Sequence, residues 1–226
     1  MLRGAGLGAS DLVVDVGCGT GRLTLPLAAL TPARVVGVDA EARMLEVARS
    51  KDAAARVEWL RGSAYRLPLA DRATALVVMV MVVHLLRQRV RAFREAHRVL
   101  GTGGQLSVWT FTPRHVAEFY LNAYFPSIPM IDRPRFPSAE VLTAELRRAG
   151  FAEVRVEVRE EVRRLDIADV VDRVRGRYIS TLGMLPPLEY RLGLQQLEER
   201  LAQDRATTLA QRSEWAIITA RTTTAE

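Results

Sequence analysis

The sequence LVVDVGCGTGR, residues 12–22, joins a short apolar run to a turn that has glycine at every second position. A run of this length bounded by glycine is typical of a buried strand, and Leu23, Leu27 and Leu30 then follow with helical spacing. Glycines in such a turn permit positive φ and let a ligand come close to the backbone. Free amides at a helix start favour an anionic or polar group. The stretch therefore predicts a strand–turn–helix unit that binds a ligand at its turn.

The alternation of strand and helix patterns continues to residue 111. Apolar runs predict four further strands, at Arg34–Val38, Val57–Leu60, Leu76–Val83 and Leu106–Phe111. Helical spacing separates them at Glu41–Ser50 and Val90–Leu100, and the glycines within 101–104 predict a turn. Strands that alternate with helices of this length indicate an α/β fold with a parallel sheet and right-handed crossovers.

The rhythm changes after Phe111. Residues 112–137 are rich in aromatic residues and proline with few regular signals, whereas residues 166–212 have mainly helical spacing. Between and after them we expect a helix at Ala139–Ala149, a half-exposed strand at Val154–Val158 and a short strand at Trp215–Ala220. We therefore expect one domain, residues 1–226, with two insertions at 112–137 and 166–212.

Composition excludes several classes of protein. The chain has 226 residues, of which 49% are apolar and 26% charged, as in ordinary globular domains. Its single cysteine, Cys18, rules out an internal disulfide, and we expect no metal site. No apolar run is long enough to span a bilayer and no signal peptide is evident, so we expect a cytoplasmic protein. The formal net charge is +6, but the arginines are spread over every segment, so we expect no nucleic-acid partner.

Asp39 is a candidate for binding the ribose of a nucleoside. Asp39 lies 22 residues after Gly17, at the end of the second expected strand, where it can accept hydrogen bonds from ribose hydroxyls. The dinucleotide fingerprint would require a third glycine at the position of Arg22. The pattern therefore favours a nucleoside-containing cofactor other than a dinucleotide.

Five ordered stretches resemble the class I S-adenosylmethionine-dependent methyltransferases, most closely the type 11 group that includes the ubiquinone and menaquinone biosynthesis enzymes. These stretches are Val13–Arg22, Val36–Leu45, Leu60–Asp71, Val77–Leu86 and Arg94–Val108. The resemblance covers residues 10–111 well and 138–160 more loosely. It implies a Rossmann-like doubly wound sheet of about seven strands, mostly parallel with an antiparallel last strand, and helical insertions that form a lid.

The resemblance also implies the cofactor and its contacts. The cofactor would be S-adenosyl-L-methionine, leaving S-adenosyl-L-homocysteine as product. Asp15 and the turn Gly17-Cys18-Gly19-Thr20-Gly21 would hold its methionine end, and Asp39 its ribose. Around the adenine and beside the cofactor we expect Ala40, Met44, Ser63, Ala64, Met79 and Val80. Many relatives have aspartate at the position of Ser63, so adenine recognition differs here.

The expected reaction is methyl transfer by in-line displacement to a small hydrophobic or aromatic acceptor, since proximity and orientation supply most of the catalysis. His84 and His115 are the candidate bases. The substrate contacts are expected from the insertions, at Tyr120, Tyr124, Arg135 and Tyr178. The aromatic residues there could equally form a small core of their own.

Two other functions stay open from the sequence. The basic surface would suit an RNA or protein methyltransferase, and the Ser63 departure would suit a non-catalytic S-adenosylmethionine-binding protein. The oligomeric state is also open, with a homodimer as one option.

Overall fold

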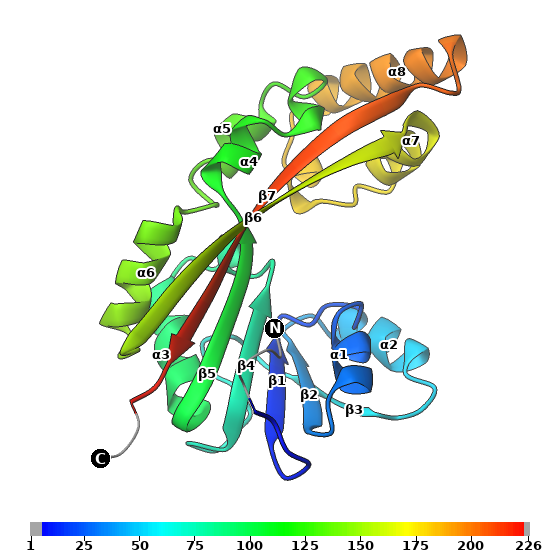
Figure 1. Cartoon of the computed structure of the whole chain (residues 1–226). Coiled ribbons are helices and arrows are strands. Elements are labelled where there is room, and N and C mark those ends of the chain that lie inside the picture. The colour runs from blue at the N-terminus through cyan, green and yellow to red at the C-terminus, as the bar shows by residue number, and fades with distance from the viewer. Residues whose placement is uncertain (1–5, 224–226) are drawn as a thin grey trace. The chain divides into compact units, whose positions relative to one another are not determined.

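A computed structural model of the chain describes residues 6–223, which form a mixed sheet flanked by helices (Figure 1). In the described residues the sheet has seven strands in the order β3-β2-β1-β4-β5-β7-β6. The strands are β1 (Leu12–Val16), β2 (Arg34–Asp39), β3 (Val57–Arg61), β4 (Thr74–Val80), β5 (Leu100–Phe111), β6 (Glu153–Asp166) and β7 (Thr208–Arg221). The pairs β1–β2, β1–β4, β2–β3 and β4–β5 are parallel.

The last strand runs against its neighbour. The Thr222 amide donates to the Gly104 carbonyl at 3.0 Å, and the Thr112 amide donates to the Glu214 carbonyl at 3.2 Å. Residue numbers thus rise along β5 as they fall along β7, which makes this pair antiparallel. The expected sheet, mostly parallel with an antiparallel last strand, is confirmed.

Eight α-helices and three short 3-10 helices connect the strands of the described chain. The α-helices are α1 (Thr24–Leu30), α2 (Ala42–Lys51), α3 (Arg89–Val99), α4 (Pro113–Ala117), α5 (Ile128–Asp132), α6 (Ala139–Arg148), α7 (Ile167–Arg175) and α8 (Pro187–Gln203). The 3-10 helices are Val83–Leu85, Tyr120–Ala123 and Ser180–Gly183. Within residues 6–223, every helix is too short or too polar to cross a membrane.

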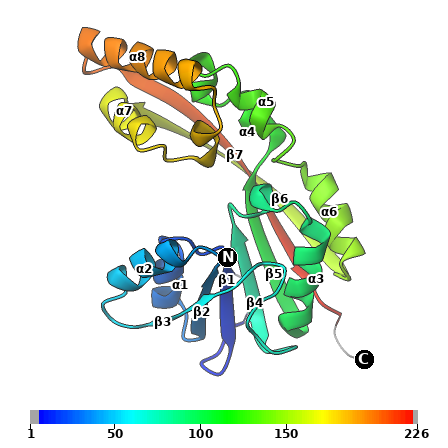
Figure 2. The same cartoon turned by 180° about the vertical axis from the view of Figure 1, so that it is seen from behind.

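Contacts divide the chain into two compact units, and the first unit contains residues 6–110, 139–157 and 216–223. The first unit has two hydrophobic cores, one on each face of the sheet. The side chains of β1 contribute to both, because successive side chains of a strand point to opposite faces. Val13 joins the core beneath α1 and α2, whereas Val14 and Val16 join the core beneath α3 and α6. Helices therefore cover both faces of the parallel strands, and α3 lies beside α6 in Figure 2. This explains why β1 and β4 are apolar almost throughout.

The second unit contains residues 111–138 and 158–215 and has a separate core. Its buried residues come from the segment around Phe125, from α7 and from α8. A Cβ at Gly193 of α8 would collide with the Phe125 ring, so glycine is required where the two approach. Both expected insertions, 112–137 and 166–212, lie inside this unit. That the whole chain acts as one domain, with the insertions as a substrate cover, stays a prediction.

Several expected element boundaries were wrong. The fourth strand ends at Val80 rather than Val83, because Val83–Leu85 forms a 3-10 helix. The expected turn at 101–104 lies within β5, where the register against β4 shifts between Thr74 and Leu76. Residues 208–212 are strand rather than helix, since β7 begins at Thr208. The half-exposed strand expected at 154–158 extends over all of β6, and three short helices (α4, Tyr120–Ala123 and α5) occupy 112–137.

Candidate functional site

The glycine turn lies where the order of the sheet reverses. From β1 the chain passes to β2 and β3 on one side, whereas β4 and β5 lie on the other side. In open α/β sheets, ligands bind outside the carboxyl ends of the strands at such a switch point. The segments that follow β1 and β4 meet there, because a Cβ at Gly17 would lie 2.5 Å from Val82 Cγ2.

The three glycines of the turn serve two different purposes. Gly17, Gly19 and Gly21 all have positive φ, of 73°, 54° and 73°. A Cβ at Gly21 would lie 2.6 Å from the Trp59 ring, so Gly17 and Gly21 are required by packing. A Cβ at Gly19 would meet no described atom within 4 Å, so the backbone there faces open space. Gly19 is therefore where a ligand can contact the turn directly.

Asp39 ties the end of β2 to this turn. Its Oδ2 accepts a hydrogen bond from the Gly19 amide at 2.8 Å, and its Oδ1 accepts one from the Glu41 amide at 2.9 Å. A carboxylate offers about four acceptor sites. Each oxygen of the half-buried Asp39 therefore keeps a lone pair for a further donor, such as a ribose hydroxyl.

Asp15 is buried below the turn, and the Thr24 hydroxyl donates to its Oδ2 at 2.6 Å. Burial raises the pKa of Asp15 to about 6, with a smaller upward contribution from the charge of Asp39, while the Thr24 hydrogen bond acts in the opposite direction. Burial, with the same two carboxylates, raises the pKa of the Cys18 thiol to about 12. Cys18 is therefore a neutral packing residue rather than a nucleophile.

The residues expected around an adenine follow β2 and β3. The Gly62 amide donates to the Asp39 carbonyl at 3.0 Å, which brings Ser63 and Ala64 beside the end of β2. The Ser63 hydroxyl accepts from the Tyr65 amide at 3.2 Å and so shapes its own loop. Ala40 is exposed and Met44, on the first turn of α2, is 44% exposed. These four residues follow the same carboxyl edge as Asp39.

The expected residues on and after β4 differ in exposure. Met79 has no exposed surface and belongs to the core beneath α3, which gives its expected cofactor contact no support. Val80 is half-buried at the end of the strand. His84 is half-buried in the 3-10 helix that follows β4.

Sequence reasoning missed three residues that shape the site. Thr24 holds Asp15, Val82 packs against Gly17, and Trp59 fills the space beneath Gly21. The last contact had a signal in the sequence. A glycine inside a strand often marks close approach of another group, and a Cβ at Gly37 would lie 2.6 Å from the same Trp59 ring.

Tyr120 and Tyr178, both in the second unit, are brought together. Their hydroxyls lie 2.9 Å apart, and Tyr178 keeps 42% of its surface exposed. Burial raises the pKa of both phenols above the ordinary value, so both are neutral near pH 7. The Tyr120 ring also packs edge-on against Phe119, with centroids 4.9 Å apart.

Arg135 and Tyr124 are engaged inside the second unit. Arg135 Nη1 donates to Asp132 at 2.7 Å and to Thr181 at 3.1 Å, and its side chain is mostly buried. The Tyr124 hydroxyl accepts from Arg200 at 3.0 Å. These contacts give the expected substrate roles of Arg135 and Tyr124 no support.

His115 lies in an aromatic cluster of the second unit. Its ring stacks on Phe111, with centroids 3.7 Å apart, and lies 5.4 Å from Phe119. Burial lowers its pKa to about 4, against a hydrogen bond to the Arg212 backbone that acts upward, so the ring is neutral at pH 7. Its Nδ1 is buried and has no hydrogen-bond partner among the described residues.

Part of the aromatic sequence is core. Leu121, Phe125 and Ile128 have no exposed surface and pack with α7 and α8. For these positions the structure favours the reading in which the insertions simply build a core.

Comparison with known proteins agrees with this geometry. Residues 13–104 match a family model described as a methyltransferase domain. A demethylmenaquinone methyltransferase from Chlorobaculum tepidum is 30% identical over 62% of this chain and 64% of its own length. The YcgJ protein from Bacillus subtilis superposes with a TM-score of 0.70 at 18% identity, over 100% of this chain and 97% of that one. A phosphoethanolamine N-methyltransferase from Haemonchus contortus, solved with S-adenosylhomocysteine, gives 0.63 at 17% identity, over 98% and 51%.

Residues 13–104 thus match a methyltransferase domain, and the described chain has the fold of the solved structures named above. Over 62% of its length the chain resembles a quinone-biosynthesis methyltransferase, as the sequence motifs predicted. The chain spans just under two thirds of the Chlorobaculum enzyme.

Proposed function

We propose that this protein transfers the methyl group of S-adenosylmethionine to a small acceptor that is hydrophobic or aromatic. One observation carries the proposal: the open backbone at Gly19 lies beside Asp39 at the switch point of the sheet. A nucleoside that carries a charged amino-acid tail fits this arrangement, because the carboxylate suits ribose hydroxyls and the turn suits the tail.

The residues at the carboxyl ends of β1 and β2 have separate roles in binding the cofactor. The two free lone pairs of Asp39 accept from the ribose hydroxyls, while its bonds to Gly19 and Glu41 fix its orientation. The Thr20 amide donates to no described acceptor and faces the tail of the cofactor. The exposed Met44 side chain packs on the adenine.

The cofactor supplies a sulfonium methyl group that is already electrophilic, so the protein mainly orients it and excludes water. A base is required only if the acceptor must lose a proton. Burial lowers the pKa of His115 to about 4, which makes its ring a weak proton acceptor at neutral pH, so the proposal assigns it no role as a base.

Small acceptors are favoured over nucleic acid for two reasons. The Chlorobaculum relative is named for a quinone substrate, demethylmenaquinone. In addition, many arginines are committed to carboxylates of the same chain, as in the Arg89–Glu145 pair at 2.7 Å and the Arg175–Glu198 pair at 2.8 Å. Such internal pairing leaves less free charge for a polyanion.

The test is calorimetric binding of S-adenosylhomocysteine to the parent protein and to Asp39→Asn. Asp39→Asn removes the charged oxygens that accept hydrogen bonds from the two ribose hydroxyls. This loss should weaken the binding free energy of S-adenosylhomocysteine by about 3 kcal/mol, or about 100-fold in affinity. Asp52→Asn is the matched control, because Asp52 also accepts backbone amides, at 3.1 and 3.0 Å, but does so at the far end of α2. Equal affinity of the parent and Asp39→Asn would refute the site.

Activity distinguishes the remaining functions. Transfer of labelled methyl from S-adenosylmethionine to a panel of quinols and phenols would support the proposal. Binding without transfer to any acceptor would support the non-catalytic alternative, and transfer only to RNA or protein would support the macromolecular one.

A further inference from the structure

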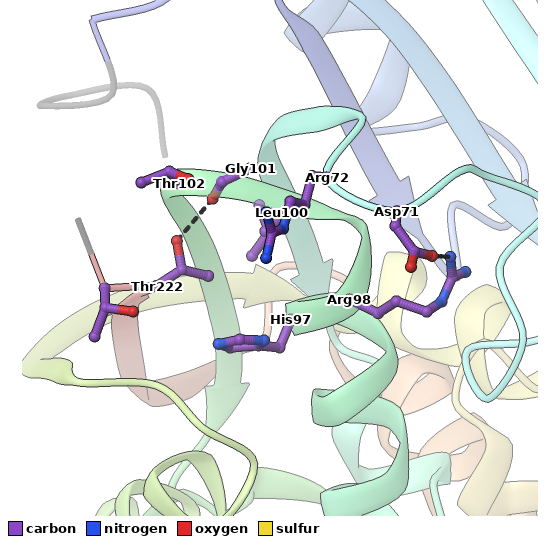
Figure 3. Close-up of a pocket in the computed structure, with 9 residues that line it drawn as sticks. Asp71, Arg72, His97, Arg98, Leu100, Gly101, Thr102 and Thr222 are labelled. Carbon is purple, nitrogen blue, oxygen red and sulfur yellow. Dashed lines mark hydrogen bonds and ion pairs between the residues drawn. The ribbon is translucent and has the colours of Figure 1, made fainter. Parts of the chain in front are cut away.

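A pocket of about 410 Å³ opens at the amino-terminal ends of β4 and β5 (Figure 3). Asp71 and Arg72, which line it, precede the start of β4 at Thr74. The Gly17–Gly21 turn follows the carboxyl end of β1. Because β1 and β4 are parallel, this pocket at the amino end of β4 lies at the opposite end of the strands. It is therefore separate from the site of methyl transfer, and its volume is within the range of small-molecule sites.

Most acceptors around the pocket are already used. The Asp71 carboxylate is paired with the Arg98 guanidinium at 2.5 Å, as the dashed line in Figure 3 shows. The Arg98 carbonyl accepts from the Arg72 amide at 2.9 Å, and the Gly101 carbonyl accepts from the Thr222 hydroxyl at 2.7 Å. These bonds leave little in the pocket that could attract a cation.

Several donors, in contrast, are unused. The side chains of Arg72, His97, Thr102 and Thr223 line the pocket and make no hydrogen bond or ion pair with another described residue. The His97 ring is held edge-on against Phe151, with centroids 5.1 Å apart. A fixed imidazole, a guanidinium and two hydroxyls are groups that oxyanions prefer.

The backbone of Arg72 adds an independent observation. Its φ is +55°, in the left-handed region that non-glycine residues rarely adopt. Strained residues of this kind concentrate at ligand sites, where the surrounding structure maintains them. The strain at Arg72 is thus located in the same pocket as the unused donors.

We propose that this pocket binds an oxyanion, the phosphate group of a small molecule, through Arg72 and His97 with the hydroxyls of Thr102 and Thr223. Arg98 contributes to the wall but not to the ligand, because Asp71 and Glu95 occupy its guanidinium. The leucine at position 100 forms an apolar floor. The proposal does not depend on the methyltransferase activity.

Histidine NMR provides the test, because the chain has only three histidines. Inorganic phosphate is titrated at constant pH and ionic strength, and the ring signals are assigned with His97→Gln. We expect a saturable shift of the His97 signal, with His84 and His115 unchanged. In Arg72→Gln the affinity should fall at least tenfold, whereas Arg147→Gln, an exposed arginine on α6, should titrate like the parent.

Two results would overturn the proposal: equal, unsaturable shifts of all three histidines, or an unchanged titration in a folded Arg72→Gln. Thr102→Val provides a second variant that leaves all charges in place, and it should also weaken binding. Glycerol phosphate and phosphatidylglycerol vesicles identify the source of the group. Binding of free phosphate or of glycerol phosphate supports a small-molecule site, and binding to vesicles alone would contradict it.

Discussion

Replacing Gly19 with alanine should damage ligand binding far more than stability. The added Cβ would meet no described atom within 4 Å, so its only cost in the free protein is the left-handed backbone, with φ of 54°. That conformation costs a non-glycine residue about 1–2 kcal/mol, or roughly 2–8 °C in Tm for a chain of this size. The methyl group would occupy the open space beside Asp39, so the affinity for S-adenosylhomocysteine should fall at least about tenfold, or about 1.4 kcal/mol.

Alanine substitutions at two further glycines, Gly6 and Gly17, separate the effect on ligand binding from the effect on stability. Gly6 has φ of 55° and also has no described atom within 4 Å of its Cβ position, so Gly6→Ala imposes the same strain away from the turn. At Gly17 the Cβ would lie 2.5 Å from Val82 Cγ2, which adds overpacking of about 1–3 kcal/mol to the strain. Gly17→Ala should therefore lose stability as well as binding.

The assay is thermal unfolding together with calorimetric titration of S-adenosylhomocysteine for all three variants. Gly6→Ala should bind like the parent, and Gly19→Ala should bind weakly despite a similar small loss of Tm. The reasoning fails if Gly19→Ala binds within twofold of the parent, or if Gly6→Ala is impaired to the same extent.

Three other predictions follow from buried groups. Burial raises the pKa of Asp15 from 3.8 to about 6, so its ionised form opposes folding and the stability of the protein rises as pH falls from about 6 to 3.8. In Asp15→Asn the free energy of unfolding at pH 7, measured with urea, should rise by up to about 3 kcal/mol, and this pH dependence should disappear. The pKa of His115 is lowered from 6.5 to about 4, so stability is complete above 6.5 and falls by about 3 kcal/mol as pH drops to 4. His115→Phe should flatten that acid limb, and an unchanged limb would exclude His115 as its cause. Gly193→Ala should unfold the second unit by collision with Phe125, at a cost of about 3 kcal/mol or more by denaturation, while S-adenosylhomocysteine still binds.

Local sequence was sufficient for the half of the chain that carries the turn. An apolar run, a glycine or proline break and helical spacing predict each β–α unit up to β5. These are short-range signals in the sequence. The position of Asp39 was also readable, because a parallel sheet places the end of β2 beside the end of β1. For the same reason the identification of the methyltransferase domain needed only the order of five short motifs.

The same reasoning failed where pairing is long-range. The β7 segment Thr208–Arg212 reads as helix, yet it is strand, since a polar stretch shows no strand pattern until a distant strand pairs with it. The glycines at 101–104 read as a turn, but β5 continues through them beside β4. The substrate contact expected at Arg135 stays a prediction, and only the structure shows that Asp132 and Thr181 accept hydrogen bonds from its guanidinium.

By itself, then, the sequence determined the class of domain, the glycine turn and the carboxylate beside it, because these depend on periodicity and on spacing along one strand–turn–helix unit. The tertiary structure decided which glycine faces open space, which arginines are already paired, and that unused donors gather around Arg72 at the opposite edge of the sheet. Those properties depend on which distant side chains fill the space around a residue. The sequence of the residue's own segment carries no record of that.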